Sequence, residues 1–201
     1  MSEPVTLIHS LDARYYTDPD IFKAEQKGLL ARTWQYAGHM SKVRNPGDYF
    51  LFEIAGESLF CIKGKDHVVR GYYNVCQHRA HQLVSSDGNT KLLVCPYHAW
   101  TYDLEGQLSG VFQPELFPKL DKSAIHLLSG RVDTWGGFIF VNPDSSGESL
   151  TEYLGSYADY LFPNLTFNAS KNRVSVWRFV PLSPNQCDHC YIFPAARKPI
   201  A

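Results

Sequence analysis

Charge of one sign is what this 201-residue sequence most clearly lacks. Nineteen Lys and Arg residues stand against twenty Asp and Glu residues, which leaves a formal net charge of −1. Proteins that bind nucleic acids present clustered Lys and Arg side chains to the phosphates. The near-neutral balance therefore argues against a nucleic-acid partner.

Long apolar runs and a secretory leader are missing as well. No run reaches the roughly 18 apolar residues that indicate a transmembrane helix. The first ten residues, MSEPVTLIHS, hold an acidic residue and no apolar core, unlike a secretory signal. We therefore expect a cytoplasmic protein with no membrane partner. In that reducing compartment the five cysteines are expected to be thiols or metal ligands rather than disulfides.

Two segments carry helical signals. Asp18 can cap a helix that reaches Trp34, and Pro19 suits its first position. A second helix is expected from Glu148 to Leu161, with its apolar residues on one face.

Short segments rich in β-branched and aromatic residues lie between these helices. They are separated by turn signals such as Asn45-Pro46-Gly47-Asp48, a pattern typical of a sandwich or barrel-like β domain. The predicted strands are 33–37, 49–54, 58–62, 67–74, 91–95, 100–104 and 137–142. The last, GFIFVN, is the most apolar and is expected to be central. The fold class is therefore mainly β.

Two Cys/His pairs carry the strongest chemical signal. Cys76-Gln77-His78 and Cys95-Pro96-Tyr97-His98 each follow an apolar strand segment, with sixteen residues between His78 and Cys95. This pattern predicts two loop tips at one end of a sheet domain, each offering one thiolate and one imidazole.

The mixed spacing favours two metals over one. A short thiolate and a longer imidazole from one tight turn do not easily reach the same point, but they can straddle a two-metal unit. Both cysteines would then bind one iron and both histidines the other, as in a Rieske [2Fe–2S] centre. A structural zinc is the alternative, but zinc sites usually pair Cys with Cys and His with His.

Around these pairs the sequence resembles the Rieske domain of Rieske-type non-haem iron oxygenases. That family includes aromatic-ring-hydroxylating dioxygenase large subunits and choline, glycine betaine and carnitine monooxygenases. The family pattern C-x-H-R-G and C-P-Y-H-G-W-x-Y-x-x-D-G is matched here by CQHRA and CPYHAWTYDLEG, within a resemblance over about residues 15–165. The departures are Ala80, Ala99 and Glu105; the two alanines imply that neither position needs a positive φ.

The resemblance implies stacked antiparallel sheets, with one helix before the Rieske domain and one after it. It also implies a [2Fe–2S] cluster held by Cys76, His78, Cys95 and His98. Respiratory-chain Rieske proteins add two cysteines and a serine, at positions that correspond here to His81, Tyr97 and Trp100. Without that disulfide and that donor, we expect a reduction potential at the low end of the range of about −150 to +300 mV.

In the family, electrons come from a reductase or a ferredoxin and pass to a mononuclear iron with two His ligands and one carboxylate. Asn185, Asp188, His189 and Cys190 faintly echo the helix that carries those histidines, but no second histidine follows. Prolines would also break that helix, at positions 181, 184, 194 and 199. We therefore expect no mononuclear iron in this chain, and a tail with the free thiols of Cys187 and Cys190.

These expectations divide the chain into four parts. They are a helical lead-in (1–40), a Rieske domain (41–147), a connecting helix (148–165) and the degenerate start of a missing catalytic domain (166–201). The expected function is the electron-transfer part of an oxygenase alpha subunit that hydroxylates a small organic substrate with O₂, truncated before its mononuclear iron site. The resemblance also implies a homotrimeric oxygenase assembly if the catalytic domain is supplied. The alternative is a stand-alone Rieske ferredoxin that only carries electrons.

Overall fold

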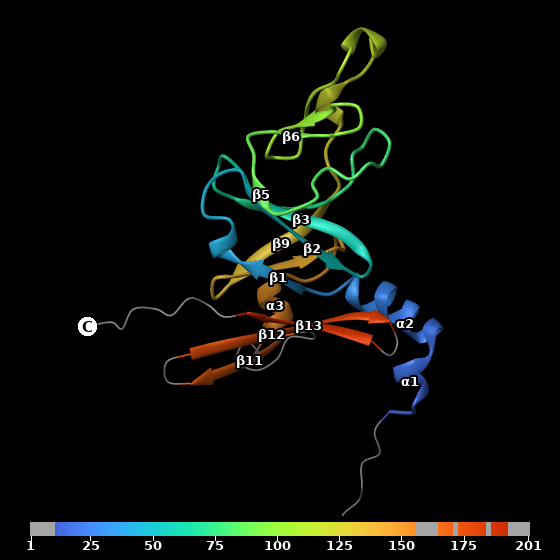
Figure 1. Cartoon of the computed structure of the whole chain (residues 1–201), viewed down its shortest axis with the longest axis vertical. Helices are drawn as coiled ribbons and strands as arrows, with labels where there is room; N and C mark the ends of the chain where they lie inside the picture. Colours follow the sequence, from blue (N-terminus) through green and yellow to red (C-terminus); the bar gives the residue numbers. More distant parts are fainter. Residues whose placement is uncertain (1–10, 156–164, 171–172, 184–185, 193–201) are drawn as a thin grey trace, which may run out of the picture.

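The computed structural model describes residues 11–155, 165–170, 173–183 and 186–192, with side chains described for 11–155 (Figure 1). It begins with the short helices α1 (Arg14–Thr17) and α2 (Pro19–Glu25) and the π-helical turn η1 (Gln26–Leu30). Asp18 caps α2 by accepting a hydrogen bond of 2.8 Å from the Asp20 N–H, as predicted. The helical region ends four residues before Trp34, because the core takes up Trp34, which is only 3% exposed.

Among the described residues every strand pair is antiparallel, and the strands form three sheets. The largest sheet has the order β1-β10-β9-β4-β3-β2-β5. Its strands are β1 (Gln35–His39), β2 (Asp48–Ile54), β3 (Glu57–Lys63), β4 (Val69–Tyr73), β5 (Gly88–Asn89), β9 (Ser129–Trp135) and β10 (Phe138–Asn142). A small sheet, which bears the second Cys/His loop, consists of β6 (Leu93–Val94), β7 (Thr101–Tyr102) and β8 (Leu108–Gly110). The mainly β class and the antiparallel sheets are confirmed.

Short helices lie between and after these strands. Three are 3₁₀ turns, η2 (Met40–Lys42), η3 (Pro114–Leu116) and η4 (Lys122–Ala124). The fourth is α3 (Leu150–Leu154), which begins with a capping box between Ser149 and Glu152. It lies within the predicted helix 148–161, of which residues 156–161 fall outside the described residues. Within the described part of the chain, no helix has the length and apolarity needed to cross a bilayer.

The predicted strands are found in the large and small sheets, with ends that differ by a few residues. β10 lies between β1 and β9 and is buried along its whole length, in keeping with its apolar sequence. Sequence reasoning missed β9, because SGRVDTW mixes polar and apolar residues and is only half-buried.

Residues 165–192 differ from the irregular tail that the sequence suggested. Their described parts form the third sheet, β11 (Leu165–Ser170), β12 (Arg173–Ser183) and β13 (Gln186–Ile192). Val174, Val176 and Val180 fall at alternate positions of β12, which suits a strand. Pro181 is accommodated because the β12–β13 register shifts between Pro181 and Ser183.

The large sheet is buried on both faces, as β3 shows. Leu59 and Cys61 pack into one core cluster with Phe50 and Ile139, while Phe60 points into another. This second cluster lies between the large sheet and the Cys/His loops and contains Cys76, Leu83, Leu93, Cys95, Trp100, Tyr102, Leu104 and Leu108. The candidate ligand thiols therefore belong to the hydrophobic core, and Cys95 directly follows β6, which is labelled in Figure 1.

Buried Asn74 fixes the first Cys/His loop to the large sheet. Its side-chain oxygen accepts the N–H groups of Leu83 and Val84, each at 3.0 Å. Its amide donates to the Val84 carbonyl at 2.8 Å and to the Ser58 hydroxyl at 3.3 Å. Both ends of the loop are thus held by one side chain that is 5% exposed.

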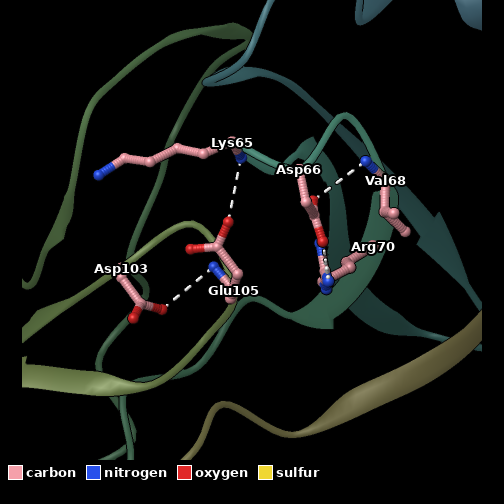
Figure 2. A network of polar contacts seen from close by, with 6 residues as sticks. All are labelled: Lys65, Asp66, Val68, Arg70, Asp103 and Glu105. Carbon is pink, nitrogen blue, oxygen red and sulfur yellow. Dashed lines mark hydrogen bonds and ion pairs between the residues drawn. The ribbon is translucent and has the colours of Figure 1, made fainter.

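Glu105 connects the small sheet to the turn between β3 and β4 (Figure 2). Its carboxylate accepts the Lys65 N–H at 3.0 Å, while its own N–H donates to Asp103 at 3.1 Å. In the same β3–β4 turn Asp66 pairs with Arg70 at 2.6 Å, and this guanidinium holds the pKa of Asp66 below its ordinary value. The departure from Asp at position 105 therefore supplies a side chain that reaches the neighbouring turn.

Candidate metal centre

The two Cys/His loops have the same backbone hydrogen-bond pattern. In the first, the Cys76 N–H donates to the His81 carbonyl at 2.8 Å, and the Ala80 N–H donates to the Cys76 carbonyl at 2.9 Å. In the second, Cys95 and Trp100 are joined at 2.8 Å, and Ala99 donates to Cys95 at 2.9 Å. Each cysteine is thus fixed at the base of a tight loop, with its histidine on the turn above.

The two thiols lie side by side beneath the loops. Cys76 and Cys95 are 2% and 3% exposed, and their side chains interact directly. Burial raises the pKa of the Cys76 thiol, although the hydrogen bond from Tyr102 acts in the opposite direction. The proximity of Cys95 adds to the increase.

The two imidazoles lie together on the outer side of the thiols. The ring centroids of His78 and His98 are 4.9 Å apart, with an interplanar angle of 66°. The pKa of His78 is lowered by burial first and then by the charges of His98 and Arg79, which favours the neutral form that a metal ligand needs. Nδ1 of His98 is buried without a hydrogen-bond partner among the described residues.

Tyr102 supports the first thiol from below. Its hydroxyl accepts the Gln77 N–H at 3.0 Å and lies 3.3 Å from the Cys76 sulfur. The Tyr102 hydroxyl oxygen already accepts the Gln77 N–H, so its own hydrogen is free to point at the sulfur. Sequence reasoning assigned no role to this hydroxyl, although the alternating burial of Trp100, Tyr102 and Leu104 follows from the period of a strand.

Aromatic rings enclose the histidines unequally. The His78 ring stacks on Trp100, with centroids 4.7 Å apart and an interplanar angle of 5°. Phe117 packs edge-on against both, at 6.1 Å from His78 and 5.9 Å from Trp100. The His98 ring instead lies 3.8 Å from the ring of Tyr97, which is 54% exposed.

The expectation about Ala80 and Ala99 was wrong. Both residues have φ of 53°, in the left-handed region that favours glycine. The reason is the loop closure, because the chain must reverse at the residue whose N–H returns to the cysteine carbonyl. Each alanine therefore adopts a conformation that costs an L-residue about 1–2 kcal/mol.

The other singled-out residues near the loops have simpler surroundings. His81 and Tyr97, at the positions of the extra cysteines in respiratory-chain proteins, pack their rings together at 5.4 Å across the two loops. Nδ1 of His81 is also 2.7 Å from the Gln82 carbonyl oxygen, as suits a structural histidine. Arg79 is exposed, and Cys61 is a fully buried core thiol whose pKa is raised by burial.

Two further features lie away from the loops. Cys187, His189 and Cys190 fall on strand β13, and only their backbone is described. A cavity of about 460 Å³ opens beside β4 and β9, lined among others by Arg70, Tyr72 and Glu105. None of the four Cys/His residues lines this cavity. Among the described residues, no group of three or more His, Cys, Asp or Glu is arranged to hold a single metal ion.

Comparison with known proteins shows which family the chain resembles. Residues 33–120 match the model of the Rieske [2Fe-2S] domain. The chain contains a Rieske domain of the oxygenase alpha-subunit type. It is 38% identical over 146 residues to the carnitine monooxygenase oxygenase subunit of Escherichia coli K12, which covers 72% of this chain and 39% of that protein.

A second relative comes from aromatic degradation. The benzene 1,2-dioxygenase alpha subunit of Pseudomonas putida is 37% identical over 153 residues, which cover 75% of this chain and 34% of that protein. The crystal structure of the apo form of the quaternary ammonium Rieske monooxygenase CntA shares the fold, with a TM-score of 0.86 and 22% identity over 92% of this chain and 74% of that one. The chain spans little more than a third of the length of the first two relatives.

The strained alanines of the Rieske domain give a stability prediction. Ala80→Gly and Ala99→Gly should each raise the free energy of unfolding by about 1 kcal/mol, since glycine adopts a positive φ without steric cost. Urea titration of the purified protein measures the change. Ala31→Gly is the control, because Ala31 has φ of −76° and should lose stability on the same change. A loss of stability at both loop positions would contradict the strain argument.

Proposed function

We propose that Cys76, His78, Cys95 and His98 ligate a Rieske [2Fe–2S] cluster, and that this chain is the electron-transfer part of an oxygenase alpha subunit. The observation that carries the proposal is the layering of the two pairs. The thiols are paired and buried in the core, the imidazoles are paired outside them, and both pairs are held by matching loops.

The four side chains suit a cluster whose two irons have different ligands. Cys76 and Cys95 would hold the inner iron as thiolates, and His78 and His98 the outer iron as neutral imidazoles. The buried Nδ1 of His98 supports this assignment, because a buried nitrogen without a partner costs about 1–3 kcal/mol unless something binds it. When bound, the cluster supplies one-electron transfer. The protein residues keep the sulfur end dry and leave the imidazole end near the surface.

The wider activity follows from the family. The chain would take electrons from a reductase or a ferredoxin and deliver them to the mononuclear iron of the oxygenase. The full enzyme would hydroxylate a small organic substrate with O₂. The names of the relatives suggest two substrate classes, a quaternary ammonium compound or an aromatic ring. We further propose a cytoplasmic location and, where a catalytic domain is supplied, a homotrimeric assembly.

A stand-alone Rieske ferredoxin is the second candidate. Ferredoxins of this type are usually shorter and lack a helical lead-in, whereas here α1 and α2 precede the domain. That flank favours the oxygenase lineage. A zinc-stabilised binding module is a third reading, and it predicts a colourless protein.

Variants of the four proposed ligands test the cluster. The wild-type protein should be red-brown, contain two irons per chain and give a rhombic EPR signal after reduction. Cys76→Ser, His78→Ala, Cys95→Ser and His98→Ala should each abolish the signal, because each removes an iron ligand. Cys61→Ser is the matched control, since Cys61 is equally buried but belongs to a different core cluster. A colourless wild type that contains zinc would contradict the proposal.

Turnover separates the oxygenase part from the ferredoxin. The reduced chain alone, given O₂ with carnitine or benzene, should form no hydroxylated product. Added to an oxygenase subunit of a carnitine or benzene enzyme whose own Rieske cysteines are mutated, it should restore part of the product, measured by mass spectrometry. Product from the chain alone would show that it holds its own oxygen-activating site. Reduction of unrelated electron acceptors without any rescue would favour the ferredoxin.

Tyr102 gives a prediction about the reduction potential. A hydroxyl that donates to a ligand sulfur stabilises the added negative charge of the reduced state. Tyr102→Phe should therefore lower the potential by on the order of 60 mV, the shift that a tenfold change in a one-electron equilibrium constant represents. Redox titration followed by EPR measures it. Tyr72→Phe is the control, because Tyr72 belongs to the same core but its hydroxyl lies beside Gly106. An unchanged potential in Tyr102→Phe would show that the hydroxyl does not donate to the sulfur.

A further inference from the structure

We infer that Trp100, backed by Phe117, is a positioning residue that locks the His78 ring and keeps the reduction potential of the centre low. The inference rests on the proposed cluster. It adds a second influence on the reduction potential, on the imidazole side, to that of Tyr102 on the thiol side. It concerns a side chain that would touch no iron and act only through His78.

Trp100 and His78 come from different loops, and their rings stack face to face. The two rings are almost parallel, at 5°, and their centroids are 4.7 Å apart. Trp100 is 5% exposed and belongs to the same core cluster as Cys76 and Cys95. The indole is therefore held in one orientation by the core. Because the imidazole stacks on it, the indole restricts the orientation of the imidazole as well.

Phe117 closes a second side of the same ring. It approaches His78 and Trp100 nearly at right angles, 87° and 84°, from the segment that contains η3. With two aromatic rings against it, the imidazole has little room to turn about χ2. His98 lacks such support, since its neighbour Tyr97 is mostly exposed.

The electrostatic effect of these rings opposes reduction. With two thiolates and two neutral imidazoles, the oxidised centre carries no net charge, and one electron from an external reductant makes it anionic. The face of an indole ring carries partial negative charge, so Trp100 disfavours additional negative charge beside His78. Trp100 and Phe117 also replace water with apolar surface, which penalises the anionic state further. Removal of the rings should therefore raise the potential.

Four variants of the full chain test this inference. Trp100→Leu removes the aromatic face and should raise the potential, measured by EPR-monitored redox titration, by about the 59 mV of a tenfold change in the equilibrium constant. It should also broaden the EPR signal, because the His78 ring is no longer held in one orientation. Trp100→Phe keeps an aromatic face and should stay close to wild type. Phe117→Leu should change both readouts in the same direction as Trp100→Leu, but less.

Phe60→Leu is the control for a loosened core. Phe60 is fully buried in the same cluster but packs on Tyr49 and Tyr72, so its replacement should lower stability without moving the potential. A wild-type potential and spectrum in Trp100→Leu, or an equal shift in Phe60→Leu, would overturn the inference. If the Trp100→Leu protein does not assemble the centre, a wild-type potential and EPR signal in Phe117→Leu would overturn the inference. Failure of the proposed function itself is distinct, because the wild-type protein would then show no rhombic signal at all.

Discussion

The closure of two loops around two buried cysteines is the constraint on which the rest of the Rieske domain depends. Each cysteine gives its N–H and its carbonyl to its own loop, so the backbone on both sides of the thiol is fixed before any metal is considered. This closure forces Ala80 and Ala99 to positive φ, and it lifts each histidine above its thiol. The hydrophobic core beneath the loops offsets that strain, because Leu83, Leu93 and both cysteines are buried there together.

The interactions around the two pairs have opposite electrostatic signs. Below the loops, the Tyr102 hydroxyl lies against the Cys76 sulfur and favours an added electron. On the histidine side, the Trp100 ring stacks on His78 and disfavours it. Trp100 directly precedes β7, which contains Tyr102, and both side chains are buried in the core beneath the loops. A displacement of this short segment would therefore change both contributions together.

The position of the candidate site was readable from sequence, because two closely spaced Cys/His pairs each follow a strand segment, whereas the binding of a cluster by these residues stays a prediction. The mixed Cys/His spacing predicted two loops with thiols inside and imidazoles outside, and the structure places the four side chains in that order. The conformation of Ala80 and Ala99 was not readable, since alanine gives no local signal for a positive φ and only the closed loop imposes it. Strand β9 was missed for a related reason: its polar residues are held by pairing with β4 and β10 rather than by their own pattern.

Under the proposed function, the route of the electron depends on where the candidate cluster site lies in the domain. The large sheet, α3 and the N-terminal helices lie at the end away from the loops (Figure 1), so an electron cannot leave through the sulfur side without crossing the whole core. On the imidazole side, the rings of Trp100, Phe117 and Tyr97 lie against the histidines, and Tyr97 is 54% exposed. Under the proposed function, donor and acceptor must therefore both approach the same small surface around His98. If they compete for this surface, reduction and delivery would be separate encounters.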